Sequence, residues 1–175
     1  MFIDARAFNQ DIAEWDVSNV INMEAMFRKA HQFNRNISSW DVSSVINMKD
    51  MFSNADRFNN GDATNAASNP LTWNTHSVID MRGMFFSGVF NQDIGSWDVS
   101  NVENMALMFK FTRKFGNAGQ PMNWTTTSLT KMQEMFRNTD AFNQDISGWD
   151  VSSVDNMAEL SLIHISEPTR LGMIS

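Results

Sequence analysis

The chain has 175 residues, with 20 acidic and 13 basic side chains and a formal net charge of −7. This balance argues against non-specific binding to nucleic acid or anionic lipid, which requires clustered Lys and Arg. The chain has no Cys, which excludes a disulfide framework or a thiolate metal site, and no apolar run reaches the roughly 18 residues of a membrane helix, so we expect no membrane insertion of this chain.

One motif recurs along the chain. It runs from Trp15 to Phe27 as WDVSNVINMEAMF and returns almost unchanged as WDVSSVINMKDMF and WDVSNVENMALMF. The copies begin at Trp15, Trp40, Trp73, Trp97, Trp124 and Trp149, which are all the Trp residues of the chain. In every copy a Met follows the Trp by eight residues, and a period of about 25 residues is typical of a stack of small units.

The chain opens inside such a unit. Met1-Phe2 has the phase of Met26-Phe27, 25 residues later. We therefore expect Met1 to be an internal repeat residue and the chain to be a fragment of a longer array that starts mid-repeat.

The residue pattern of each unit predicts two short secondary-structure elements. Trp15 and Val17 alternate with Glu14 and Asp16, and a period of two suits a short strand. The apolar residues that follow, at spacings of three, three, one and three, are typical of one face of a short helix: Val20, Met23, Met26, Phe27 and Ala30. The residues before the first Met are good N-cap types, with Lys131 as the exception: Asn22, Asn47, Asp80, Asn104 and Asn156. The predicted fold is an α/β stack of about six units, each a short parallel strand followed by a short helix.

The large apolar repeat positions could be either a core or an aromatic platform for a ligand. We favour the core, because one Trp, two Met and two Phe per unit are what a thin stack must bury, at about 1.5–3 kcal/mol for each side chain. A Phe-Asn pair precedes each regular Trp by seven residues, as at Phe8-Asn9. The Asn residues are predicted to form an internal ladder that bonds the backbone of the next unit.

Two units carry insertions. Phe58 to Trp73 spans 15 residues instead of seven, through the polar stretch NNGDATNAASNPL, and Phe115 to Trp124 spans nine. Both insertions converge on a Pro-apolar-x-Trp sequence before the unit resumes. Because a stack tolerates an insertion that loops outward, we expect both to be surface loops.

The period ends after Asn156-Met157. A Met is due at position 160 and a Phe at 161, but the chain has Leu160 and Ser161. We therefore divide the chain into a repeat domain, residues 1–159, and a tail, residues 160–175.

The unit FNQDIxxWDVSNVxNMxxMFxxA resembles the BspA-like leucine-rich-repeat surface proteins, in particular the branch with a 25-residue repeat in bacterial surface lipoproteins. The resemblance covers residues 1–159. It implies a right-handed, leucine-rich-repeat-like solenoid, a location on the cell surface or in the secreted fraction, and adhesion to an extracellular protein or cell-surface ligand. It supplies no catalytic residues, and the present sequence shows no signal, lipid-attachment Cys or anchor of its own.

The tail resembles something else. The segment LSLIHISEPTR from Leu160 to Arg170 matches an in-frame translation of the transposase adapter DNA used in sequencing libraries. We therefore interpret residues 160–175 as a non-native, adapter-derived segment and exclude them from functional reasoning. Pro168 is expected to end any helix that begins before it.

An Asp follows the Trp in four units, at Asp16, Asp41, Asp98 and Asp150. Stacked units would place these carboxylates in a column. The column could bind calcium, as periodic Asp residues do in other repeat proteins, or each Asp could face outward and accept the N–H of the turn that follows. We favour the second interpretation, because Asn74 and Thr125 interrupt the column.

The remaining polar candidates are assigned to the surface. Gln10, Gln92 and Gln144, with the Asp that follows each, are predicted to line the outer rim. His31 and His76 occupy different phases of the unit and are expected to be exposed structural residues. No catalytic, cofactor or metal site is predicted, and we expect the protein not to be an enzyme.

The leading functional hypothesis is a non-catalytic module of a cell-surface protein for protein–protein interaction or adhesion. Its interaction face is predicted on exposed strand positions, Glu14, Asp16, Ser39, Asp41, Ser96, Asp98 and Asp150, or on the insertion at residues 62–69. The alternatives are a structural spacer of a surface protein and a calcium-dependent carbohydrate binder.

Overall fold

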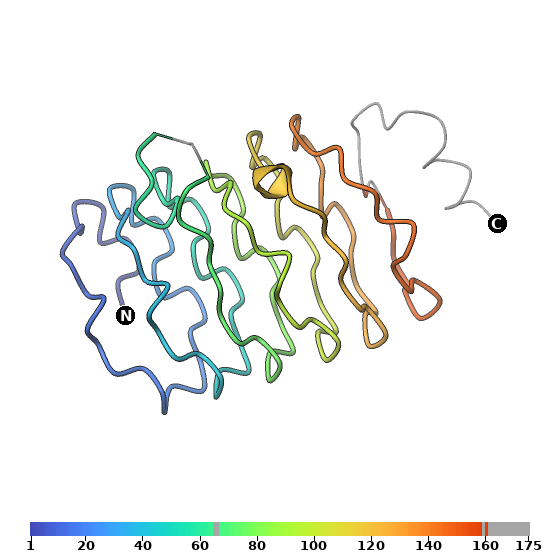
Figure 1. Cartoon of the computed structure of the whole chain (residues 1–175), viewed down its shortest axis with the longest axis horizontal. Coiled ribbons are helices and arrows are strands. Elements are labelled where there is room, and N and C mark those ends of the chain that lie inside the picture. Colours follow the sequence, from blue (N-terminus) through green and yellow to red (C-terminus); the bar gives the residue numbers. More distant parts are fainter. Residues whose placement is uncertain (65–66, 159, 161–175) are drawn as a thin grey trace.

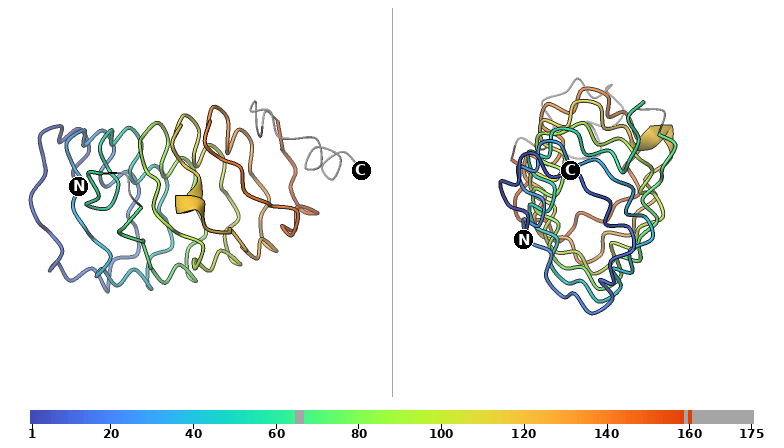
Figure 2. Two further views of the ribbon diagram at one scale, coloured as in Figure 1. Left: turned by 45° about the horizontal axis from the view of Figure 1, so that its top comes forward. Right: turned by 90° about the vertical axis from the view of Figure 1, so that its left-hand side faces the viewer.

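The chain winds into a series of coils stacked side by side along one axis (Figure 1). The structure, a computed structural model, describes residues 1–64, 67–158 and 160. Neighbouring coils are joined by five isolated parallel bridges, Asn22–Asn47, Asn47–Asp80, Asp80–Asn104, Asn104–Lys131 and Lys131–Asn156. Seen along the axis, the coils overlie one another around a common interior (Figure 2).

The predicted α/β architecture is wrong. Within the described ranges the helical element is the 3₁₀ helix η1 (Asn117–Gly119), and no strand longer than a single bridge occurs. The stack is therefore not built from strand-plus-helix units. Trp15–Val17, expected to be a strand, form an irregular segment between turns at residues 13–14 and 18–19, and the apolar stretch expected to be a helix contains turns at residues 24–29.

Successive tight turns explain the spacing that predicted a helix. The amide of Trp15 donates to Ile12, that of Val20 to Val17, that of Met26 to Met23 and that of Ala30 to Phe27, each three residues back, with N···O distances between 2.9 and 3.1 Å. The first and last residues of these turns point mainly inward and the central pairs mainly outward. An apolar residue at every third position is thus produced by consecutive β-turns as well as by a helix.

The helix fails because alternate amides bond to the next coil. The N–H groups of Met23, Ala25 and Phe27 donate to the carbonyls of Asn47, Lys49 and Met51, all at 2.8 Å. An α-helix would need those donors for carbonyls four residues earlier in the same coil. Ala25 and Lys29, at φ +53° and +60°, have the positive φ that the third residue of a type II turn requires.

The residues expected as helix caps have a different role. Asn22 forms the bridge to the next coil, and its Oδ1 accepts the amide of Glu24 at 2.8 Å. The same bond to the amide two residues later recurs at Asn47, Asp80, Asn104 and Asn156. Lys131 forms its bridges without a side-chain acceptor for such a bond.

Two columns of Phe rings fill the core, as the core prediction required. In one coil Phe27 and Phe33 stack with ring centroids 4.2 Å apart, and Phe27 stacks on Phe52 of the next coil at 5.5 Å. The pattern continues to Phe136 and Phe142. A Trp column flanks them, and each indole Nε1 after the first donates to a carbonyl of the preceding coil, as Trp40 does to Ile12 at 3.0 Å.

The predicted Asn ladder is confirmed. The Oδ1 atom of Asn9 accepts the amide of Asn34 at 3.0 Å, that of Asn34 accepts Asn59 at 2.9 Å, and that of Asn59 accepts Asn91 at 2.8 Å. Asn91 continues the series to the amide of Gly116 at 2.9 Å. Each side chain therefore satisfies a backbone donor of the following coil.

Both insertions leave the same edge of the stack, as Figures 1 and 2 show. Each begins with a buried Asn at positive φ, Asn60 and Asn117, whose Oδ1 accepts the amide of Ile37 or Ile94 at 2.9 Å. Gly61 follows at φ +83°, and a Cβ there would lie 2.9 Å from the backbone N of Asn36. The start of each insertion is thus fixed to the body of the stack.

The end of the described chain continues the backbone hydrogen bonding between coils. Leu160 stands where a Met was due; its amide donates to Met157 at 3.1 Å and its carbonyl accepts the amide of Phe136 at 3.0 Å. Residues 161–175, which carry the rest of the adapter prediction and the expectation for Pro168, lie outside the described residues. No helix in the described part has the length and apolar character needed to cross a membrane.

Candidate interaction face

The residues directly before and after each Trp form one exposed face, which we call the Trp face. It contains Glu14, Asp16, Ser39, Asp41, Thr72, Asn74, Ser96, Asp98, Asn123, Thr125, Gly148 and Asp150, all exposed. The seven predicted interaction residues all lie on it. Their predicted exposure is confirmed, because an inward Trp directs its two neighbours outward whether or not a regular strand forms, and their role in binding stays a prediction.

Charge is distributed unevenly around the coil. The six segments from three residues before the Trp to five after it contain five acidic side chains, Glu14, Asp16, Asp41, Asp98 and Asp150, and no Lys or Arg. These segments thus carry five of the 20 acidic side chains of the chain with no Lys or Arg to offset them. The rest of the Trp face is rich in hydroxyl and amide groups.

The Asp column has the turn geometry favoured above. The Oδ1 of Asp16 accepts both the backbone amide of Ser18 at 3.0 Å and its hydroxyl at 2.6 Å. The same pair of bonds holds Asp98 and Asp150, and the Ser43 amide binds Asp41. These hydrogen bonds, the side-chain one first, lower the pKa of Asp16, Asp41 and Asp150, so the carboxylates stay ionised.

Asp98 has an additional partner. Its Oδ2 lies 2.8 Å from Nδ1 of His76, one coil away. The bonds from the Ser100 hydroxyl and amide, followed by that from His76, lower the pKa of Asp98 to about 2. His76 is exposed, as predicted, whereas His31 is half-buried, with its Nδ1 2.7 Å from Oδ2 of Asp56.

The calcium hypothesis gains no geometric support. Within residues 1–64, 67–158 and 160, no group of three or more His, Asp or Glu side chains is arranged to hold a metal ion. The Asp oxygens of the column are instead directed toward turn amides and hydroxyls of their own coil.

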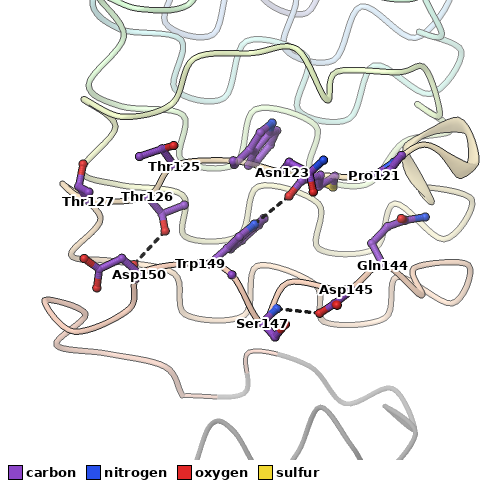
Figure 3. Close-up of a pocket in the computed structure, with 13 residues that line it drawn as sticks. Pro121, Asn123, Thr125, Thr126, Thr127, Gln144, Asp145, Ser147, Trp149 and Asp150 are labelled. Atoms are coloured by element: carbon purple, nitrogen blue, oxygen red, sulfur yellow. Dashed lines mark hydrogen bonds between the residues drawn. The ribbon is translucent and has the colours of Figure 1, made fainter.

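A hollow of about 700 Å³ lies on the Trp face between the coils of Trp124 and Trp149 (Figure 3). Asn123, Thr125, Asp145 and Asp150 line it with polar groups. The walls are held by the indole of Trp149, which donates to Met122 at 3.0 Å, and by the Thr126 hydroxyl, which donates to the carbonyl of Asp150 at 2.9 Å. It is a largely polar recess, and a second recess of about 570 Å³ reaches Ser39 at another point of the Trp face.

The first insertion is held by a buried carboxylate. Asp62 accepts the Thr64 amide and hydroxyl at 2.7 Å each, and the Gln92 side chain at 3.2 Å. Burial works to raise the pKa of Asp62, but these hydrogen bonds outweigh it and hold the pKa at about 2. Gln92 is fully buried, so its assignment to the outer rim is wrong: the insertion covers it, and its Oε1 accepts the Asn69 amide at 2.8 Å.

The opposite side of the stack has the opposite charge. We call it the turn face and define it by the segments 23–33, 48–58, 81–90, 105–115 and 132–142, which carry nine basic and five acidic side chains. Trp40 and Phe27 meet in the core with ring centroids 6.1 Å apart, so the outward neighbours of these two rings point away from each other. The coil is therefore negative on one side and positive on the other.

Sequence reasoning missed an aromatic pair on the turn face. Phe86 and Phe111 contact edge to face, with centroids 5.8 Å apart, and Phe111 is 36% exposed. The equivalent positions of other coils are polar: Ser53 and Lys110 match Phe86, and Asn54 and Asn138 match Phe111. A comparison of the units position by position would have found this pair.

Comparison with known proteins identifies a family but no individual relative. No curated protein and no solved structure matches the chain. One family model, described as "Mycoplasma protein of unknown function, DUF285", matches residues 1–70 and 61–162. These two matches span the whole stack of coils, and the chain therefore belongs to the DUF285 family.

Proposed function

We propose that this chain is a non-catalytic repeat module of a surface protein, related to the BspA-like proteins, that binds an extracellular protein or cell-surface ligand through its Trp face. The proposal places the protein on the cell surface or in the secreted fraction. Membership of a repeat family and the motif resemblance support the placement.

The observation that carries the proposal is the Trp face itself. Six coils present the same pair of outward positions side by side, with five carboxylates and no Lys or Arg in the surrounding segments. Burial of the intervening Trp side chains, from Trp40 onward, fixes the backbone beneath these groups, so little conformational entropy is lost there on binding. Repeated, even surfaces of this kind serve as recognition surfaces in stacked-repeat proteins.

The test is binding of the fluorescently labelled chain to cultured animal cells and to their deposited extracellular matrix. A triple variant, Asp41→Asn, Asp98→Asn and Asp150→Asn, removes charge but keeps the turn acceptor, as Asn74 does naturally for the His76 amide at 3.2 Å. We expect this variant to lose at least about tenfold in affinity, because the charges that it removes complement the partner.

The matched control removes charge from the other side. Lys29→Ser and Arg57→Ser change two exposed turn-face residues and should leave binding unchanged. Equal losses in the triple variant and the control would contradict the assignment to the Trp face. Loss of binding on chelation of calcium would favour the calcium-dependent carbohydrate binder instead.

A structural spacer is the second candidate function. The observation in its favour is the continuous pair of Phe columns, from Phe2 and Phe8 to Phe136 and Phe142, which makes a rod without a break at either insertion. A spacer would show no saturable binding to cells or matrix, and its surface variants would all behave like the parent chain.

A further inference from the structure

The aromatic pair Phe86 and Phe111 departs from the repeat at a cost. Phe111 has φ +63°, in the left-handed region that a bulky side chain rarely adopts. Lys29, Asn54, Ser87 and Asn138 hold the same position in other coils, with φ between 56° and 60°. The position therefore tolerates polar residues, and Phe111 is not required to fill the core. A strained, partly exposed aromatic at a normally polar position is a feature that points to recognition.

Basic residues border this aromatic pair. Arg113 and Lys114 are the central residues of the turn that the Phe115 amide closes on Thr112 at 3.0 Å, and both are exposed. The ion pairs found among the described residues do not include them. Nζ of Lys110 lies 5.3 Å from the Phe111 ring centroid and forms an ion pair with Glu134. The surface thus combines an apolar contact with the positive charge of Arg113 and Lys114, for which the described part of the chain provides no carboxylate ion-pair partner.

The Trp face has the complementary character. Its segments have five carboxylates and no Lys or Arg, and it holds the polar recess between the coils of Trp124 and Trp149. The two faces also share one spacing. Both are generated by the same coils, whose Phe rings stack at centroid separations of 5.5 to 5.9 Å in most steps. When two copies lie alongside each other, rows of carboxylates and rows of basic residues can therefore stay in register over several coils.

We propose that a second copy of this chain docks its Trp face on the turn-face surface formed by Phe86, Phe111, Arg113 and Lys114. The two surfaces lie on opposite sides of the coil, so the contact is heterologous. Each docked copy leaves a free Trp face and a free turn face, and the association is open-ended and lateral. The inference rests on the Trp face being an interaction surface, as proposed above.

Sedimentation of the whole chain over a range of concentrations tests the docking. We expect dimers and larger species at low ionic strength, and dissociation when salt rises from about 0.05 M to about 0.5 M, because the contact is largely electrostatic. A chain that remains monomeric at every concentration at low salt would overturn the proposal. It would leave binding to cells through the Trp face unaffected, so the two ideas fail separately.

Two single-face variants give the sharper test. The turn-face variant carries Phe86→Ser and Phe111→Asn, the residues that other coils use at these positions. The Trp-face variant carries Asp41→Asn, Asp98→Asn and Asp150→Asn. Each variant alone should be monomeric, and an equimolar mixture should form a one-to-one dimer that does not grow, because each partner retains the face that the other lacks.

Complementation also shows that both variants are folded. Asn138→Ser, in the row of Phe111 but one coil later, is the matched control and should associate like the parent chain. A mixture of the two variants that stays monomeric would overturn the heterologous arrangement. Parent chain that is monomeric but binds phosphatidylserine vesicles through Phe86 and Phe111 would identify a membrane contact and would likewise overturn the proposal.

Discussion

Truncation of a single Trp should lower the free energy of unfolding of the stack, and the loss should depend on how far that Trp is buried between coils. Trp40 is 3% exposed, and its indole Nε1 donates to the Ile12 carbonyl of the preceding coil at 3.0 Å. Replacing such a side chain with Ala removes the transfer free energy and leaves a cavity, at about 3–5 kcal/mol. The carbonyl left without a donor adds about 1 kcal/mol.

Trp15 is the internal reference for this experiment. It occupies the same place in the first complete unit but is 42% exposed. Trp15→Ala should therefore cost only about 1–2 kcal/mol, since roughly half of its surface is already in water. Trp40→Phe keeps a ring and removes the N–H donor, so it should fall between the two Ala variants.

Urea unfolding, followed by the fluorescence of the remaining Trp residues, measures these free energies from the midpoint and slope of each transition. The informative quantity is the difference between Trp40→Ala and Trp15→Ala. Equal losses at the two positions would refute the argument that coil-to-coil burial of the indole, rather than its presence in the motif, determines its contribution.

Three further predictions concern the polar framework. Asn59→Ala should cost about 1–3 kcal/mol in thermal or urea unfolding, because it leaves the part-buried Asn91 amide without its acceptor, whereas Asn138→Ala, at a half-buried turn position, should cost less. Gly83→Ala should destabilise the protein by about 1 kcal/mol, because Gly83 has φ +61° and the new Cβ would lie 2.2 Å from Oδ1 of Asp50. The Asp50 side chain would then have to move away from Arg82, and a melting temperature equal to that of the parent would contradict this prediction. The pKa of Asp62 is lowered from 3.8 to about 2, so its ionised form should add about 2 kcal/mol to the free energy of unfolding above pH 4, and this contribution should be lost as the pH falls toward 2. Asp62→Asn should flatten this part of the plot of stability against pH. An unchanged plot would show that the hydrogen bonds of Asp62 do not depend on its charge.

The inward half of the repeat could be predicted from the sequence. Trp, Met and Phe recur at fixed offsets, and side chains that recur in every unit of a stack must either stack on themselves or face solvent. The Phe columns, the Asn ladder and the outward Asp residues follow from this rule. The insertion sites could be predicted for the same reason, since the register is recovered at the Trp after each one.

The backbone that carries these side chains could not be predicted. An apolar spacing of three fits a helix face and a chain of β-turns equally well, and periodicity does not reveal where each amide donates. Asn22 illustrates the ambiguity, because an Asn before an apolar run suits a helix N-cap, an Asx turn and a bridge position. The positive φ values at Ala25 and Lys29 decide between these outcomes, and neither residue type predicts a positive φ.

The sequence differences among the coils are concentrated at their outward positions. An inward residue contacts its counterparts in both neighbouring coils, so a change there must be matched twice, as the stacked rings of Phe27, Phe52 and Phe85 show. An outward residue carries no such constraint, and the coils differ most there: Asp98 against Asn74 on the Trp face, Phe111 against Asn138 on the turn face. The first insertion also leaves the stack at an edge, where buried Asn60 and Asp62 anchor it without disturbing either Phe column. If the proposed binding function holds, its specificity would therefore come from the differences among the units, because their similarities form the common core.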